Sequence, residues 1–221
     1  MTKNTTPTKF AGASRGTLLL ALLIGLAAGI MTAVLLATLP SGPAPTMQTT
    51  GKALVGGPFS LLDASGKRVT EKDFAGRPLL VYFGFTNCPD VCPAGLQVIA
   101  AALDRLGDKA GDVGVVFITV DPERDTPELV GKYAASFHKH ILGLSGSSDD
   151  IAAVTKAYRV YAKKVPDEER PGDYSVDHST FMYLMDGNGE YTRHFPHSVD
   201  AAELAGALTQ AIEGSAGGPA S

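Results

Sequence analysis

The stretch "LLVYFGFTNCPDVCP", residues 79–93, joins a continuous apolar run to the only two cysteines of the chain, Cys88 and Cys92. An unbroken apolar run such as 79–85 is typical of a strand that is buried on both faces. Beyond the cysteines, apolar side chains recur at helical spacing, at Leu96, Ile99, Leu103 and Leu106. The stretch therefore predicts a buried strand and then a helix, with both thiols where the strand ends and the helix begins and with Pro93 suited to the first helical turn.

Strand and helix patterns alternate through the following chain. Residues 59–70 alternate around a Ser-Gly pair and predict a hairpin, and 113–120 predict a second buried strand. The other predicted elements are a helix at 126–137 with Thr126 as N-cap, a helix at 147–161, a hairpin at 179–195 and a closing helix at 200–212. This alternation indicates an α/β sheet with parallel crossovers and helices on both faces.

The two cysteines follow the carboxyl end of a predicted strand, which is where open α/β sheets bind ligands. A Cys-x-x-x-Cys spacing on or entering a helix places both sulfurs on one helical face. The partial positive charge of the helix N-terminus favours the thiolate form. Such a pair can reduce a disulfide, close into one, or bind a soft metal such as Cu(I) or zinc. For a metal site, a third ligand must come from elsewhere in the chain.

Length and composition limit the roles that the thiols can have. The chain has 221 residues, of which 44% are apolar, enough for one globular domain with a core that needs no disulfide. A disulfide that closes one helical turn would constrain little of the unfolded chain, although an oxidising compartment would permit it. The chain has no tryptophan and a net charge of −4, so it lacks the basic footprint of a nucleic-acid-binding protein.

The five histidines are the candidates for a third ligand. His178, in "DYSVDHSTFMYLMD", comes just before a predicted buried strand, from where it could reach the cysteines. Its position fits a metal ligand and a packed histidine at a strand edge equally well. His138 and His140 are expected on a solvated helix end, His194 in a hairpin strand and His197 in a turn.

An uncharged apolar segment, residues 17–39, precedes the predicted domain. As a helix it would span about 35 Å, enough to cross a bilayer core of about 30 Å. Secretory signal peptides have apolar regions of about 7–15 residues before a small-x-small cleavage site. This segment is longer, and the following "LPSGPAPT" has no Ala-x-Ala, so a retained anchor is favoured over a cleaved signal.

Charge predicts the topology of that anchor. Lys3, Lys9 and Arg15 are the only charged residues before Lys52, and basic flanks stay on the cytoplasmic side. We expect a single-pass protein of the inner, cytoplasmic membrane whose acidic domain is periplasmic or otherwise extracytoplasmic. The expected parts are a cytoplasmic segment at 1–16, the anchor at 17–39, a linker at 40–57, the domain at 58–213 and a disordered tail at 214–221.

Three separated motifs, "YFGFTNCPDVCP", "TVDPERDTPE" and "DYSVDHSTFMYLMDGNGE", resemble those of the Sco/SenC family of membrane-anchored copper proteins. The resemblance covers about residues 50–212. It implies a thioredoxin-like fold with a central mixed sheet flanked by helices, after an N-terminal transmembrane helix. It also implies one copper per chain, as Cu(I), Cu(II) or both, bound by Cys88, Cys92 and His178.

The family resemblance implies a role and partners as well. The role is delivery of copper to the CuA site of cytochrome c oxidase, so the CuA-bearing subunit is an expected partner and another copper carrier a candidate donor. Many members have histidine directly before the first cysteine, whereas this chain has Asn87. Asp121 and Asp177 are candidates for orienting His178 or tuning nearby charge, although the Asp177 side chain is expected to point away from that of adjacent His178.

The resemblance leaves an enzymatic alternative open. Paired thiols on a thioredoxin-like fold could act as a thiol–disulfide reductase that keeps the CuA-site cysteines reduced. A peroxidase is less well supported, because peroxiredoxins place threonine three residues before the cysteine and Thr86 is two before Cys88. A carrier without enzymatic activity is the favoured interpretation.

Overall fold

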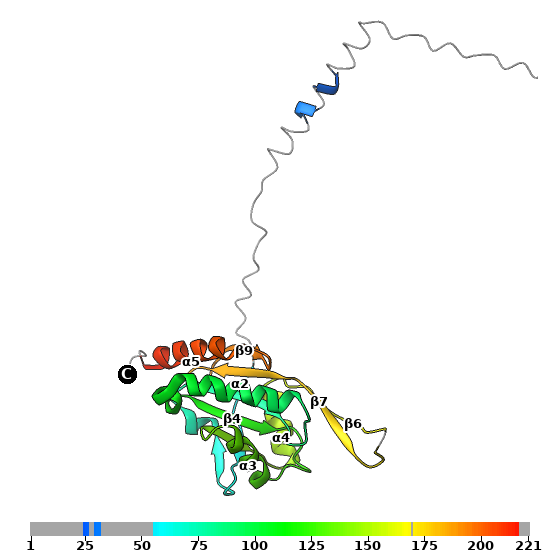
Figure 1. Ribbon diagram of the computed structural model, residues 1–221, viewed down its shortest axis with the longest axis vertical. Coiled ribbons are helices and arrows are strands. Elements are labelled where there is room, and N and C mark those ends of the chain that lie inside the picture. Colours follow the sequence, from blue (N-terminus) through cyan, green and yellow to red (C-terminus); the bar gives the residue numbers. More distant parts are fainter. Residues whose placement is uncertain (1–23, 27–28, 32–54, 169, 217–221) are drawn as a thin grey trace, which may run out of the picture. The chain divides into compact units, whose positions relative to one another are not determined.

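The computed structural model describes residues 24–26, 29–31, 55–168 and 170–216. The compact unit Lys52–Ser221 contains the whole predicted domain and is shown as a ribbon in Figure 1. Of the predicted anchor at 17–39, only 24–26 and 29–31 are described, and both pieces are helical. Among the described residues, no helix has the length and apolar character needed to cross a bilayer.

A mixed five-stranded sheet forms the centre of this unit, with the strand order β5-β4-β3-β8-β9. β3 pairs in parallel with β4 and antiparallel with β8, so it lies in the middle of the sheet. The strands are β3 (Leu79–Gly84), β4 (Gly114–Thr119), β5 (Ile141–Leu144), β8 (Phe181–Met185) and β9 (Tyr191–Pro196). The central mixed sheet implied by the family resemblance is confirmed.

Helices cover both faces of the sheet, as predicted. One face packs against α2 (Val91–Leu106), α3 (Pro127–Phe137) and α5 (Ala201–Ala216), and Figure 1 shows α2 and α5 lying along the sheet. The other face packs against α4 (Ser148–Ala157) and the hairpin of β1 (Ser60–Leu62) and β2 (Arg68–Thr70). Two short 3-10 helices, η1 (Glu71–Phe74) and η2 (Gly107–Asp112), connect these elements.

The alternation of side chains along β3 explains why every residue in it is apolar or glycine. All six of its positions are buried. Leu80 and Tyr82 face the layer of α2, α3 and α5, whereas Val81 and Phe83 face the layer of α4. Since successive residues of a strand point to opposite faces, two apolar layers require a continuous apolar run.

The helix boundaries agree with the capping signals in two of three cases. Pro93 lies in the first turn of α2, and the side chain of Thr126 accepts a hydrogen bond from the Leu129 N–H at the start of α3. The helix predicted at 147–161 ends instead at Ala157. Arg159 has φ of 58°, a left-handed conformation that no helix continues through.

Three strands and one helix end were not predicted. β5 is only four residues long, too short for a clear pattern. β6 (Ala162–Pro166) and β7 (Tyr174–His178) form a separate two-stranded sheet, called the arm below, which projects from the body in Figure 1. α5 continues through Ala216, which corrects the prediction of disorder for 214–216.

Candidate metal centre

The two cysteines lie at the junction of β3 and α2. Cys92 is the second residue of α2, whereas Cys88 lies in the turn before it. The Sγ of Cys88 accepts a hydrogen bond from the backbone N–H of Cys92 at 3.4 Å, as expected for a thiolate at a helix N-terminus. Both are free thiols and both are buried, at 7% and 0% exposure. The pair is therefore held inside the fold rather than displayed on its surface.

Close packing against β3 fixes the position of Cys92. A Cβ on Gly84 would lie 2.8 Å from the Sγ of Cys92 and 2.6 Å from Cε2 of Phe117. Such contacts are shorter than side-chain atoms allow, so only glycine fits beneath the thiol. The end of β3 thus provides both the turn and the space for the second sulfur.

His178, at the end of β7, is brought to this pair. Its Nε2 lies 3.5 Å from the Sγ of Cys92, and its ring meets Phe85 edge-on with centroids 5.8 Å apart. Its Nδ1 lies 2.9 Å from the carbonyl oxygen of Ser179. Because a carbonyl can only accept, Nδ1 carries the proton and Nε2 keeps its lone pair in the neutral ring. The lone pair therefore faces the thiols.

The surroundings favour a single thiolate. The hydrogen bond from Cys92 is the largest cause that lowers the pKa of Cys88 well below that of an ordinary thiol, and two backbone N–H groups add to it against the opposing effect of burial. His178 lowers this pKa only in the form in which its Nε2 also carries a proton to donate. The same Cys88–Cys92 hydrogen bond, together with burial, raises the pKa of Cys92. Cys88 is therefore the anionic sulfur and Cys92 the protonated one before any metal displaces that proton.

The carboxylate of Asp121 contacts Arg124 and Tyr174 rather than the ring of His178. This carboxylate is fully buried and accepts hydrogen bonds from Arg124 at 2.5 Å and from the Tyr174 hydroxyl at 2.8 Å. The group that meets Nδ1 of His178 is the backbone carbonyl of Ser179. Asp177 is exposed on the strand next to His178, as its alternating position predicts.

The remaining histidines lie elsewhere in the fold. His138 stacks on His140, with centroids 5.4 Å apart, and approaches Asp104 at 3.6 Å; it is partly buried rather than fully solvated. His194 is exposed and contacts the Tyr191 hydroxyl at 2.5 Å. Asn87, beside the first cysteine, is exposed.

A buried carboxylate below the cysteine turn was missed by the sequence reasoning. Asp125 is 1% exposed and accepts hydrogen bonds from the Thr86 N–H and hydroxyl and from the Thr119 hydroxyl. The Ser145 hydroxyl donates to its backbone carbonyl. Asp125 therefore ties the turn before Cys88 to the ends of β4 and β5. Its place in "TVDPERDTPE" was a signal, but its partners are distant in sequence.

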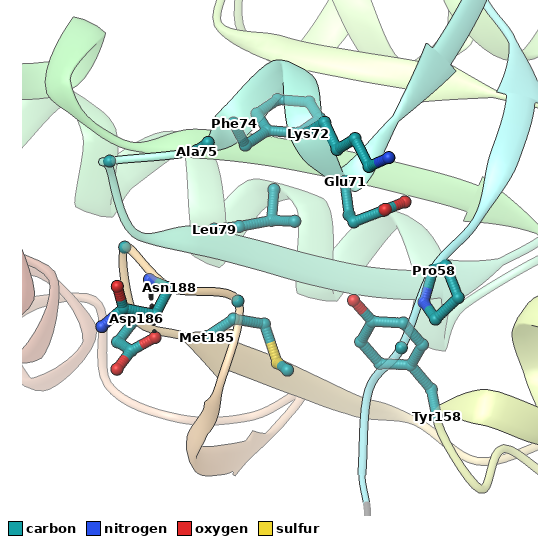
Figure 2. Close-up of a pocket in the computed structure, with 14 residues that line it drawn as sticks. Pro58, Glu71, Lys72, Phe74, Ala75, Leu79, Tyr158, Met185, Asp186 and Asn188 are labelled. Atoms are coloured by element: carbon teal, nitrogen blue, oxygen red, sulfur yellow. Dashed lines mark hydrogen bonds between the residues drawn. The ribbon is translucent and has the colours of Figure 1, made fainter.

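A cavity lies at the other end of β3. Its volume is about 590 Å³ and its lining includes Phe74, Leu79, Tyr158 and Met185, which Figure 2 shows between η1 and the turn after β8. Leu79 begins β3, whereas the cysteines follow its other end. Because the lining includes neither cysteine nor His178, the cavity is separate from the candidate metal centre.

Two thiols and one imidazole are a suitable donor set for Cu(I). Bonds of about 2.3 Å to sulfur and about 2.0 Å to nitrogen, as found for zinc, are compatible with the 3.5 Å between Cys92 and His178. In the part of the chain that the structure describes, however, no three His, Cys, Asp or Glu side chains already converge as metal ligands. Metal binding would thus require a local adjustment that brings the three donors to one point.

Comparison with known sequences identifies the family. The sequence model of the SCO1/SenC family matches residues 47–213. A relative, the mitochondrial Protein SCO1 homolog 1 of Arabidopsis thaliana, is 46% identical over 163 residues, which are 73% of this chain and 48% of that protein. The chain thus spans about half the length of this curated relative. It belongs to the SCO1/SenC family.

Solved structures of relatives agree with this assignment. Bradyrhizobium japonicum ScoI with copper bound is 46% identical, with a TM-score of 0.67 over 71% of this chain and 99% of that one. Arabidopsis thaliana ScoI with copper bound is 44% identical, with a TM-score of 0.66 over 72% of this chain and 99% of that one. The thioredoxin-like fold implied by the sequence motifs is confirmed.

Proposed function

We propose that this protein is a membrane-anchored copper carrier that binds one copper through Cys88, Cys92 and His178 and delivers it to the CuA site of cytochrome c oxidase. The observation that carries the proposal is the contact between the Nε2 of His178 and the Sγ of Cys92. It joins residues 86 positions apart, and it presents an imidazole lone pair to a buried thiol pair. The copper-bound relatives, at 44% and 46% identity, support the choice of metal.

The donor set suits a cargo that must be handed on. Soft thiolates select Cu(I), and a three-donor site leaves a coordination position open for a ligand from the partner. Copper can then move by stepwise ligand exchange, in which each new bond to the partner replaces one bond to this chain. The CuA-bearing subunit is the proposed acceptor, and another copper carrier the proposed donor.

The membrane assignment is part of the proposal. Residues 17–39 would hold the chain in the inner membrane, with the domain on the extracytoplasmic side, because the flanking charges before the segment are all basic. A reporter fused after Ser221 should be active only outside the cytoplasm. Activity confined to the cytoplasm would contradict this topology.

The low pKa of Cys88 supports a second candidate function. A stabilised thiolate beside a protonated thiol is suited to attack a disulfide, with the second thiol resolving the mixed disulfide. The chain could therefore reduce the cysteines of the CuA subunit. Both functions need Cys88 and Cys92, but only copper binding needs His178 as a ligand.

The test compares His178→Ala with His194→Ala in the full chain, purified in detergent, reduced and loaded anaerobically with Cu(I). Wild type and His194→Ala should retain one copper per chain, and excess copper at about a thousand times the Kd should add about 4 kcal/mol to their stability. His178→Ala should lose copper to a chelator and fail to load an apo CuA domain, while it still reduces an oxidised one. If the purified His178→Ala protein keeps copper like wild type, the proposed copper site is wrong. If a strain with His178→Ala assembles cytochrome c oxidase normally at limiting copper while strains with the cysteine variants do not, the protein acts as the reductase.

A further inference from the structure

The arm that carries His178 has little apolar attachment to the rest of the chain. β6 is exposed at every position, and in β7 only Val176 is buried. In the described structure these two strands pair with each other and not with the central sheet. Because burial of apolar surface is the main favourable term in packing, polar contacts must supply a large share of what fixes the position of the arm.

One side chain of the body makes several of those polar contacts. Arg124, in the loop after β4, donates from Nη1 to the Asp173 carboxylate at 3.0 Å and to the Tyr174 carbonyl at 2.9 Å. Its guanidinium carbon lies 3.8 Å from the centroid of the Tyr174 ring. Its Nε donates to Asp121, which also accepts from the Tyr174 hydroxyl. Arg124 and Asp121 therefore hold the start of β7 from two sides.

Burial distinguishes this contact from the other ion pair to the arm. The side chains of Arg124 and Asp173 are 26% and 31% exposed, so their charge-assisted hydrogen bond is partly shielded from solvent. Lys164 of the arm also pairs with Glu123 of the same loop, but those side chains are 43% and 62% exposed. Exposed pairs contribute little. The Arg124 contacts are thus the principal polar latch of the arm.

We propose that Arg124 is the positioning residue for His178, and that closing and opening of its contacts with Asp173 and Tyr174 control how firmly copper is held. The inference rests on the proposed copper function. Tyr174 and His178 are the two ends of β7, about 13 Å apart at about 3.3 Å per residue. The strand is kept straight by its pairing with β6, from Tyr174 opposite Pro166 to His178 opposite Ala162. Fixing one end of this short ribbon therefore fixes the other.

The latch gives a route to copper release that leaves the thiols in place. When the Arg124 contacts open, His178 withdraws and the site is reduced to two sulfurs held by the body of the fold. A two-sulfur site retains copper less firmly and exposes it to a ligand of the acceptor. Arg124 itself touches neither thiol nor metal, and it acts through β7.

The experiment compares Arg124→Gln with Arg170→Gln in the full chain in detergent. Arg170 is the control for charge, because it pairs with Asp167 and shares Asp173 with Arg124 but makes both pairs within the turn of the arm and none to the body. Amide hydrogen exchange of the copper-free protein should rise at least about tenfold across residues 162–178 in Arg124→Gln, while β3 and β4 exchange as in wild type. Copper dissociation into a chelator should be faster by at least about tenfold, and the nitrogen signature of His178 in the Cu(II) electron paramagnetic resonance spectrum should weaken. Arg170→Gln should match wild type in all three.

The double variant Arg124→Gln/His178→Ala separates positioning from general stability. If Arg124 acts through His178, the double variant should lose copper no faster than His178→Ala alone. Tyr174→Phe, which removes the hydroxyl bond to Asp121 and leaves Arg124 in place, provides a milder change that should shift exchange and copper loss in the same direction. Additive losses in the double variant, or equal behaviour of Arg124→Gln and Arg170→Gln, would overturn the proposal. If instead His178→Ala itself retains copper like wild type, the proposed copper site is contradicted, and not only the proposed role of Arg124.

Discussion

The turn between β3 and α2 carries Cys88, Cys92 follows in the first turn of α2, and both thiols are buried. In the two strands of the arm, which ends in His178, only Val176 is buried. The turn is tied to β4 and β5 through Asp125. The arm is tied to the body through Arg124. Two of the proposed copper donors therefore belong to the core, and the third belongs to a separately attached hairpin.

This difference teaches how one site can both hold and release a metal. Donors that are fixed by core packing lose little conformational freedom on binding, so they supply affinity. A donor on a weakly attached element can leave without unfolding the domain, because local opening draws on the least stable parts of a structure. Variants in the two regions should therefore fail in different ways, and the expected effects decrease in the order below.

The largest effect on copper affinity is expected when one of the two buried cysteines is replaced. Cys92→Ser replaces a soft sulfur with a hydroxyl that is a poor ligand for Cu(I). Loss of an outer partner of a metal ligand weakens binding by about 10–100-fold, and loss of the ligand itself should exceed this. Competition with a chelator measures the affinity, and Cys92→Ser should be weaker than His178→Ala. Equal affinities for these two variants would contradict the division into a core pair and a detachable third donor.

Gly84→Ala should lower the stability of the fold by overpacking the core next to Cys92. The added methyl would lie within 3 Å of Phe117 and Cys92 atoms that are fully buried, and overpacking of this kind destabilises by about 1–3 kcal/mol. Denaturant unfolding of the copper-free full chain measures the change. Gly206→Ala is the matched control: it is exposed in α5 with no atom within 4 Å of the added Cβ, and it should stabilise by about 0.5–1 kcal/mol. Loss of stability in both variants alike would count against the packing argument.

The smallest effect is expected on the pKa of Cys88 when His178, on the arm, is replaced. Cys92 is the largest cause of the lowered pKa of Cys88, and His178 is a lesser one. Removal of a donor destabilises the thiolate and raises the pKa. In the copper-free protein the ultraviolet absorbance of the thiolate should therefore shift to higher pH only slightly in His178→Ala and much further in Cys92→Ala. The reverse order would show that the arm, and not the turn, sets the thiol chemistry.

Local patterns were sufficient for the elements that lie in the core. The apolar run at 79–85, the spacing of Leu96, Ile99 and Leu103, and the N-cap at Thr126 each predicted an element that the structure contains. Burial on both faces leaves little freedom in residue type, so such elements can be recognised without knowledge of their partners. The arm was not predicted because its strands are mostly exposed and bury only Val176.

The sequence by itself determined an α/β domain, a thiol pair at the end of a buried strand and, through its three motifs, the family. It left the role of His178 open, because no local pattern distinguishes a ligand from a packed histidine. Tertiary structure placed His178 against Cys92, and this contact is what supports its proposed role as a ligand. It also placed the carboxylate of Asp121 against Arg124 and Tyr174. The physical reason is that a strand or helix is encoded by neighbours along the chain, whereas a metal site and its supports are made by residues that only folding brings together.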